Sequence, residues 1–297
     1  MMKPNTIGKV EMILAMMLSS TIGVFVYESG QSPLNAVFYR CLFGFMFLGF
    51  YAWVRGYLDP SKVTGKEWLL MLAGGVTLVL NWCFLFTSFS FAPIGITTVA
   101  YHTQPIFVLL IAALFLRERF EAHNWFWVVV AFSGVLMIVD PFSSGWSENL
   151  IFGISSALIA AIFYALTTLI TQRLTHIKPH LIATVHLALG TLMMVTFAPV
   201  KEVPAAGHHW YWLLALGFLQ TAVMYILLYG AFQKLETPMI AVLAYVYPVA
   251  TVMVDYLVYG NAITPLMTLG MVAILFAGFA MNRNIRPFQW KRKAQTC

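Results

Sequence analysis

The stretch FAPIGITTVAYHTQPIFVLLIAALFLRER, residues 91–119, decides the fold class. It is long and apolar enough to cross the roughly 30 Å hydrocarbon core of a bilayer as a helix. Near its centre lie His102, Gln104 and Pro105, which are residues that a helix surrounded by lipid avoids. The stretch therefore predicts a membrane span whose middle faces protein or water.

The composition of the whole chain also places it in a bilayer. Of the 297 residues, 61% are hydrophobic and 9% are charged, and the mean hydropathy is +0.82. A soluble domain has about a quarter of its residues charged, so this chain has too few charges to cover a water-facing surface. Cys41 and Cys83 lie in apolar stretches and Cys297 is the last residue, a distribution that implies no disulfide framework.

Apolar windows between short polar breaks predict ten transmembrane helices. The first is a retained span rather than a cleaved signal peptide, because Tyr27 and Glu28 stand where small cleavage-site residues are expected. The breaks are so short that neighbouring helices must pack as antiparallel hairpins. The predicted spans are 7–28, 33–55, 67–89, 93–116, 123–140, 150–172, 179–200, 209–232, 237–259 and 264–282.

Basic residues orient the chain, because loops rich in lysine and arginine stay on the cytoplasmic side. With the N-terminus inside, every lysine and arginine except Arg40 and Lys201 falls in a cytoplasmic segment. We therefore predict a multi-pass protein of the bacterial inner (cytoplasmic) membrane with cytoplasmic N- and C-termini. The net charge of +6 is then an orientation signal. The basic tail, residues 283–293, fits the surface of the lipid bilayer and requires no nucleic-acid partner.

The opening stretch has a second copy later in the chain. With two residues added at its start, residues 89–119, it aligns at a shift of 143 residues with FQKLETPMIAVLAYVYPVATVMVDYLVYGNA, residues 232–262. This alignment places Pro105 on Pro248 and Glu118 on Asn261. The two prolines then fall at matching depths in the fourth and ninth spans.

A second pair of stretches repeats at a slightly larger shift of 146 residues. SPLNAVFYRCLFG, from residue 32, resembles KPHLIATVHLALG, from residue 178, and the alignment places Arg40 on His186. We therefore predict two halves of five spans, residues 1–145 and 146–297. Because five is odd, the second half enters the membrane from the opposite side, an arrangement typical of secondary transporters with a site near the midplane.

Pro105 and Pro248 predict two bent helices near mid-membrane. Proline donates no backbone hydrogen bond and crowds the carbonyl four residues earlier, which frees the carbonyls of Tyr101 and Ala244. A free carbonyl cannot face lipid, so it must face protein or a wet cavity. We therefore expect an all-α integral membrane protein, with ten transmembrane helices as two inverted five-helix repeats around a central cavity. Bending for packing alone is the alternative.

A mid-span proline leading to a Glu-Arg pair, followed by a glycine-containing span, resembles the EamA-type branch of the drug/metabolite transporter superfamily. Here the pattern reads APIGITTVAYHTQPIFVLLIAALFLRERF and then WVVVAFSGVLMIV, and the arginine of SPLNAVFYR adds to it. The resemblance covers essentially the whole chain. It implies ten helices, a central cavity and movement of small metabolites or drugs, often outward. Asn261 departs from the family, which often repeats the glutamate there.

Polar and aromatic side chains near the two prolines are the candidates for substrate binding. Tyr245 occupies the position equivalent to His102, and Tyr247 that of Gln104. Such a lining suits amphipathic or cationic metabolites. Packing and interfacial anchoring are the alternatives for the aromatic residues, and bonding to a neighbouring helix is the alternative for the histidine. The candidates are Asn81, Trp82, Tyr101, His102, Gln104, Tyr245 and Tyr247.

Arg40 is the one basic side chain deep in a predicted span, and it is a further candidate for substrate binding. Its planar guanidinium can donate two parallel hydrogen bonds to a carboxylate. It can equally snorkel outward or pair with Glu28 or Asp255. Glu11, His102 and Asp255 are the groups that can carry protons through the span region, with an interfacial anchor as the alternative for each acid.

The sequence contains none of the short motifs that mark an enzyme, such as HExxH, paired CxxC, GxSxG or a P-loop lysine. His176 and His180 do not predict a metal site, because Pro179 breaks the helix between them. No catalytic residue, metal or cofactor is therefore expected. Gly134 and Gly278 occupy matching places in the fifth and tenth spans, where small residues allow close packing within the chain or in a homodimer.

These observations predict a secondary transporter and not an enzyme. We expect it to move a small polar or amphipathic metabolite, an amino-acid-like compound or a drug, across the inner membrane by alternating access. Export is the direction that the family resemblance implies. An importer of a similar metabolite is the alternative, followed by a membrane-embedded enzyme or a channel.

Overall fold

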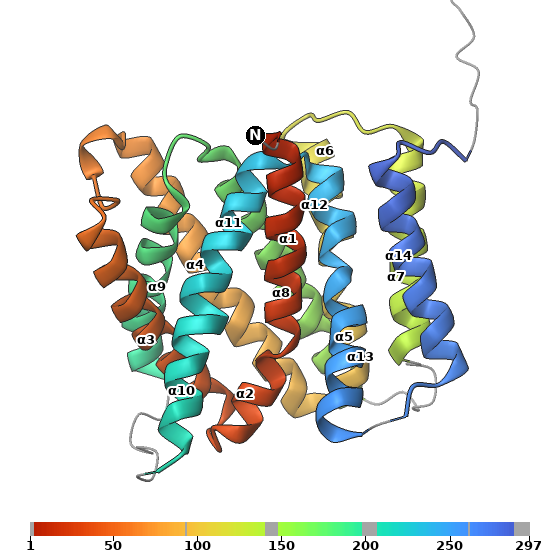
Figure 1. Ribbon diagram of the computed structural model, residues 1–297, viewed down its shortest axis with the longest axis horizontal. Helices are drawn as coiled ribbons and strands as arrows, with labels where there is room; N and C mark the ends of the chain where they lie inside the picture. Colours follow the sequence, from red (N-terminus) through yellow and green to blue (C-terminus); the bar gives the residue numbers. More distant parts are fainter. Residues whose placement is uncertain (1–2, 93, 140–147, 198–206, 261, 288–297) are drawn as a thin grey trace, which may run out of the picture.

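The computed structural model describes residues 3–92, 94–139, 148–197, 207–260 and 262–287. These residues form a bundle of α-helices without a β-strand (Figure 1). Ten stretches are long and apolar enough to cross a membrane, which confirms the predicted all-helical membrane fold. They are Pro4–Glu28, Leu34–Val54, Gly65–Phe91, Ile96–Phe115, Ala122–Val139, Glu148–Arg173, Pro179–Thr196, His209–Lys234, Thr237–Tyr259 and Pro265–Asn282.

Several spans consist of more than one helical element. The first five spans contain α1 (Pro4–Ser20), α2 (Ile22–Glu28), α3 (Pro33–Val54), α4 (Gly65–Phe91), α5 (Ile94–Tyr101), α6 (Gln104–Phe115) and α7 (Ala122–Val139). The last five contain α8 (Glu148–Arg173), α9 (Pro179–Phe197), α10 (His209–Gly217), the π-helix η3 (Phe218–Val223), α11 (Met224–Lys234), α12 (Thr237–Ala244), α13 (Val246–Tyr259) and α14 (Pro265–Asn282).

Local sequence signals set where the helices begin. Proline occupies the first turn of α1, α3 and α14, where its missing N–H is not needed. The helix α4 begins with a capping box. In this box the Glu67 carboxylate accepts from the Thr64 N–H at 2.8 Å, and the Thr64 hydroxyl accepts from the Glu67 N–H at 3.4 Å.

Element bounds in the two parts of the chain follow the 143-residue shift seen in the sequence. α5 and α12 have equivalent bounds, and so have α7 and α14. Arg117, two residues after α6, adopts the left-handed conformation with φ of 56°, and so does the equivalent Gly260, directly after α13, with φ of 71°. The predicted boundary between residues 145 and 146, and also Asn261, lie outside the described residues.

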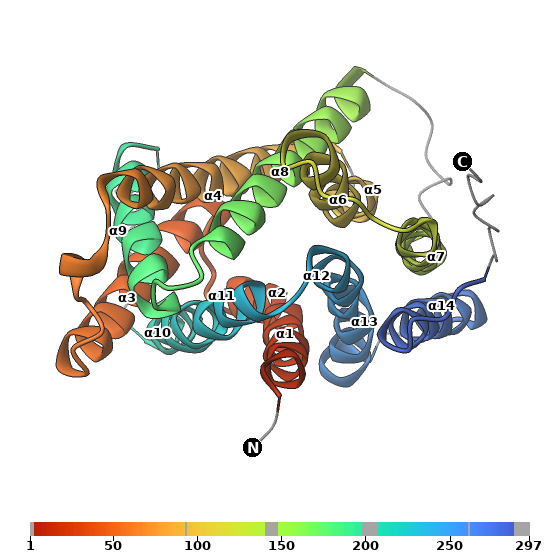
Figure 2. The ribbon, with the colours of Figure 1, turned by 90° about the horizontal axis from the view of Figure 1, so that it is seen from above.

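Helices from the first five spans pack mainly against helices from the last five. The most extensive contacts pair α4 with α8, α7 with α14, α3 with α9 and α1 with α11. In Figure 2, α7 and α14 stand together to one side of the other helices. The two groups of spans therefore meet along interfaces that run through the whole bundle.

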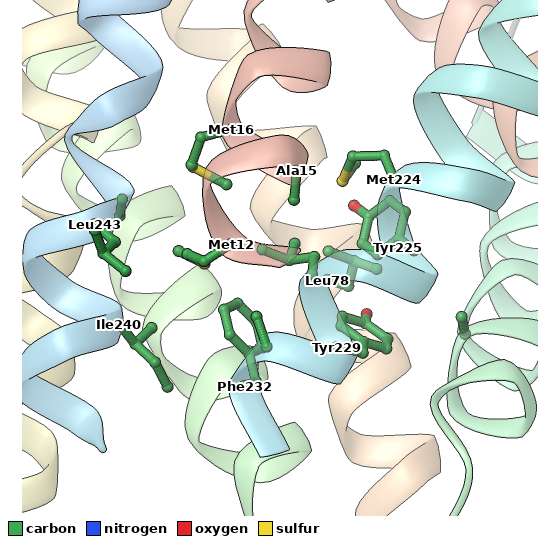
Figure 3. Packing of buried hydrophobic residues seen from close by; sticks show 14 of the residues in the cluster. Met12, Ala15, Met16, Leu78, Met224, Tyr225, Tyr229, Phe232, Ile240 and Leu243 are labelled. Atoms are coloured by element: carbon green, nitrogen blue, oxygen red, sulfur yellow. The ribbon is translucent and has the colours of Figure 1, made fainter. Parts of the chain in front are cut away.

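The core lies between these paired helices. Met12 and Met16 of α1 are buried beside Tyr225 and Tyr229 of α11 and Ile240 of α12 (Figure 3). Large apolar side chains also cover the outside of the bundle, as a lipid-facing surface requires. Among the most exposed are Phe50, Trp53, Leu69, Leu114, Phe115, Leu192 and Leu257.

Close backbone contact joins α7 to α14. A Cβ atom added at Gly134 would lie 2.6 Å from the carbonyl oxygen of Gly270, and one added at Gly270 would lie 2.5 Å from that of Gly134. Gly134 therefore packs within the chain. Gly278 does not share this contact, because a Cβ added there would meet nothing within 4 Å.

Candidate functional site

Both predicted proline positions coincide with breaks in their spans. The fourth span is interrupted at His102 and Thr103, between α5 and α6, and Pro105 lies in the first turn of α6. The ninth span is interrupted at Tyr245, between α12 and α13, three residues before Pro248. At both breaks an amide bonds the carbonyl three residues earlier, as in a tight turn.

The two breaks lie next to each other. The rings of His102 and Tyr247 are tilted by 47° with centroids 5.3 Å apart. His102 is 4% exposed and Tyr245 is 0% exposed. Side chains from the fourth and ninth spans therefore pack together at this point.

Asn81 connects α4 to α5 and α8. Its amide nitrogen donates to the Tyr101 hydroxyl at 3.2 Å and to the Ala160 carbonyl at 2.8 Å. The ring of Tyr101 also meets the ring of Tyr164, with centroids 6.2 Å apart. The predicted residues Asn81 and Tyr101 thus lie together and contact the sixth span.

Arg40 lies at the interface between α3 and the π-helix η3. Its Nε donates to the Thr221 hydroxyl at 3.4 Å, and its Nη2 donates to the Gln220 carbonyl at 3.5 Å. Its guanidinium carbon lies 4.8 Å from the ring centroid of Trp82. The ring of Trp82 in turn meets that of Tyr225 edge-on at 6.3 Å.

Pairing of Arg40 with an acid, one of the alternatives that the sequence left open, is not seen among the described residues. Among the described residues, neither Glu28 nor Asp255 lies within 4.0 Å of the Arg40 guanidinium, the limit for an ion pair. The acids are not reached because the Arg40 side chain points toward η3, in the interior of the bundle. Glu28 ends α2, and Asp255 lies half-buried on α13.

Glu11 forms an ion pair across the interface of α1 and α11. Both of its carboxylate oxygens accept from the Lys234 ammonium, at 2.8 and 2.7 Å. The same ammonium donates to the Gly230 carbonyl at 3.1 Å. In this structure Glu11 therefore links the first span to the eighth.

Several buried polar atoms in the middle of the bundle have no hydrogen-bond partner among the described residues. In a bilayer such an atom cannot turn to surrounding water, so it needs a partner from protein, bound water or cargo. The closed arrangement of the rings supplies none. These atoms include Asn81 Oδ1, Gln104 Oε1, Gln220 Oε1 and the Tyr245 hydroxyl.

A pocket of about 840 Å³ opens at the end of the bundle where α1 begins, which we call the amino-terminal end. Its polar lining comes from α1, α7, α8, α11, α12 and α14 and from the segment between α6 and α7. The lining residues include Lys9, Glu118, Arg119, Glu121, Gln172, Lys234, Glu236, Thr237 and Asn282.

This pocket lies nearer the membrane surface than the predicted site. Met239 of α12 lines it, whereas Tyr245 lies about 9 Å further along the same helix by helical rise. The predicted site residues do not line this pocket. This pocket and the site predicted around His102 and Tyr245 are therefore different regions of the bundle.

Polar contacts around the pocket join the first five spans to the last five. The Thr237 hydroxyl donates to the Glu118 carboxylate at 2.9 Å. The Lys9 ammonium donates to the side-chain oxygen of Asn282 at 2.6 Å. These bonds hold the two groups of spans together at the amino-terminal end.

The comparison with known families decides the class of the protein. The model of the EamA-like transporter family matches the chain twice, over residues 6–140 and over residues 151–283. The chain belongs to the EamA-like transporter family. This result confirms the resemblance seen in the sequence, and the multi-pass helical fold is that of a membrane transporter.

Relatives of this EamA-like transporter carry transporter and exporter names. It is 28% identical to the uncharacterized transporter YxxF of Bacillus subtilis, over 94% of this chain and 90% of that protein. It is 30% identical to the pseudopaline exporter CntI of Pseudomonas aeruginosa, over 72% and 75%. It is 29% identical to the threonine/homoserine exporter RhtA of Escherichia coli, over 74% and 73%. These names describe transporters rather than enzymes.

A solved crystal structure shares the fold of the EamA-like transporter. The two structures superpose with a TM-score of 0.80, over 93% of this chain and 96% of the other. Their sequences are 16% identical.

Two polar groups in the EamA-like transporter escaped the sequence reasoning. Gln220 and Thr221 lie in the π-helix, where the Gln220 amide donates to the Thr21 hydroxyl at the break between α1 and α2. His186 Nδ1 lies 2.6 Å from the Tyr229 hydroxyl, and both residues are buried. The available signal was the same in each case, namely a polar residue inside an apolar span.

Proposed function

We propose that this protein is a secondary transporter that exports a small polar or amphipathic metabolite across the inner membrane by alternating access. The observation that carries the proposal is the meeting of two interrupted spans beside buried polar atoms that lack partners. Broken helices at mid-depth are where carriers of this general design bind cargo. The unpartnered atoms supply hydrogen bonds that cargo or water completes when the bundle opens.

The distribution of charge supports a cytoplasmic position for the amino-terminal end. Every described lysine and arginine except Arg40 lies at or near this end of the bundle. Positively charged segments stay in the cytoplasm. The pocket then opens toward the cytoplasm, which is the side from which an exporter collects its cargo.

Alternating access requires the two groups of spans to move against each other. The contacts Glu118–Thr237 and Lys9–Asn282 hold the amino-terminal end together, and the rings of His102 and Tyr247 close the middle. We propose that cargo passes from the pocket to the level of His102 when these rings separate. Asn81, Trp82, Tyr101, Gln104, Tyr245 and Tyr247 then provide its surroundings.

The relatives favour export as the direction. Both CntI and RhtA are named as exporters, and the RhtA name specifies threonine and homoserine. An amino-acid-like cargo is therefore the first class to test. Because the sequence contains no phosphate-binding loop for ATP, we propose that an ion or substrate gradient drives the movement.

Comparing the metabolites around bacteria with and without overproduction of the protein tests this function. We expect one class of small metabolite to accumulate in the medium at least severalfold when the protein is made. Depletion of a metabolite from the medium would instead indicate an importer. An unchanged medium, with the protein shown to be in the membrane, contradicts transport of a cellular metabolite.

A further inference from the structure

Arg40 is a buried positive charge without a negative partner among the described residues. It is 5% exposed, and no described carboxylate lies within ion-pair distance. A charge buried in a membrane protein requires a partner or water, because removing it from water is costly. Arg40 therefore lacks in this structure the group that would balance its charge.

The contacts that Arg40 does make leave most of its hydrogen-bonding capacity unused. A guanidinium carries five N–H donors. The bonds to Thr221 and to the Gln220 carbonyl, at 3.4 and 3.5 Å, are long and go to neutral acceptors. The ring of Trp82 covers one side of the guanidinium at 4.8 Å and leaves its edges free to bond.

The position of Arg40 is accessible to cargo in principle, because it lies where the two groups of spans meet. α3 belongs to the first five spans, and η3 belongs to the eighth span. A Cβ added at Gly44 of α3 would lie 2.6 Å from Thr221 Cγ2, so the helices touch here. Separation of the two groups of spans opens this contact and exposes the guanidinium.

We propose that Arg40 receives a carboxylate group of the transported metabolite, with Trp82 holding the guanidinium in place. This inference rests on the proposed transport function. A planar fork matches the two oxygens of a carboxylate. One arginine balances a single negative charge, whereas a phosphate group with about two charges needs further cations. Among the described residues, Arg40 is the one lysine or arginine at this depth.

The first test is the chemical class of the metabolites that the wild-type protein releases from overproducing cells. We expect each metabolite whose release depends on the protein to carry a carboxylate. If nothing is released, the proposed function fails and the inference falls with it. If neutral or purely cationic compounds are released, transport stands and the role of Arg40 is wrong.

The second test measures selectivity in liposomes that contain the purified full-length protein. The probes are the most abundant released carboxylate and its primary amide, beginning with L-threonine and its amide because of the RhtA name. We expect the wild type to favour the carboxylate in KM by about tenfold or more, as for a hydrogen bond to a charged group. In Arg40→Gln this preference should disappear, because the neutral amide of glutamine does not distinguish the probes.

Two further variants separate recognition from a structural role. Arg40→Lys keeps the charge but loses the fork, so we expect a higher KM for the carboxylate and an unchanged KM for the amide. Arg40→Lys also serves as the test variant if Arg40→Gln does not fold. Arg55→Gln, at the exposed end of α3, is the matched control and should retain the wild-type preference.

Three results would overturn the role of Arg40. The first is an unchanged carboxylate preference in folded Arg40→Gln. The second is wild-type KM for the carboxylate in Arg40→Lys. The third is rescue of Arg40→Gln by Asp255→Asn or Glu28→Gln, which would show that the arginine pairs with an acid of the protein in another conformation.

Discussion

At the scale of single residues, the middle of the bundle combines burial with incomplete hydrogen bonding. Asn81 uses its amide nitrogen twice, yet its oxygen has no described partner. Gln104 and Tyr245 likewise keep a buried oxygen without a partner among the described residues. Each such atom destabilises the closed arrangement, which is the energetic reason to expect water or cargo at this level in another conformation.

His102 is the residue whose replacement tests the mid-membrane site most simply. We expect His102→Ala to reduce transport by about tenfold or more, because it removes both the ring that meets Tyr247 and a polar group at the break. Initial rates of cargo uptake into liposomes measure the effect. His176→Ala, at an exposed histidine paired with Glu67, is the control and should transport normally. Normal transport by folded His102→Ala would remove His102 from the mechanism.

At the residue scale, the sequence predicted how deep a residue lies in the membrane better than it predicted which neighbour its side chain faces. Tyr101 and Asn81 were placed at one level and do bond each other. Arg40 lies inside its span as expected. Its contacts could not be chosen from the alternatives, because sequence does not give the rotation of one helix about its axis relative to another. The contact of Arg40 with η3 depends on that rotation and on a π-turn.

At the scale of helices and turns, proline made two of the interruptions in the spans predictable. Two other interruptions contain no proline and were not predicted. Pro105 and Pro248 mark the interruptions of the fourth and ninth spans. The break at Thr21 and the π-helix have no proline. There the hydroxyls of Thr21 and Thr221 donate to the carbonyls of Leu18 and Leu216. Such side-chain competition with the backbone has little sequence signature.

The contact between α7 and α14 gives a prediction at this scale. A side chain at Gly134 has no room beside the Gly270 carbonyl, so Gly134→Leu should force the helices apart. We expect a loss of about 1–3 kcal/mol in stability, as for other overpacked interiors. The lowered unfolding temperature of the purified protein measures it.

Gly278→Leu is the matched control for Gly134→Leu, since it introduces the same side chain into the same helix pair. A Cβ at Gly278 meets nothing within 4 Å, so the unfolding temperature should stay near that of the wild type. Equal destabilisation by both variants would contradict the packing described for α7 and α14. A homodimer that packs through the Gly278 side of α14 remains a separate prediction. Comparing the oligomeric state of Gly278→Leu with that of the wild type tests it.

At the scale of the whole molecule, the pocket and the packed middle of the bundle fit one state of the proposed transport cycle. The pocket opens at the amino-terminal end, and the rings of His102 and Tyr247 pack together near mid-depth. Sequence alone predicted the ten spans, because their length and hydropathy are visible in it. Successive spans then cross the membrane in opposite directions. The sequence did not predict where the pocket lies, because this depends on how the two groups of spans are placed relative to each other.

The central claim is that the two interrupted spans enclose a hydrated site at mid-membrane. Labelling of single cysteines tests it most directly. The native Cys41, Cys83 and Cys297 are first replaced by serine. One new cysteine is then introduced, either by His102→Cys or by Tyr245→Cys. Met239→Cys, in the pocket, is the positive control for access from the proposed cytoplasmic side.

Aqueous thiol reagents should label positions 102 and 245 slowly, in step with opening of the bundle, and released metabolites should protect them. Complete resistance of both positions to reagents from either side of the membrane, in variants whose Met239→Cys control reacts, would contradict the account.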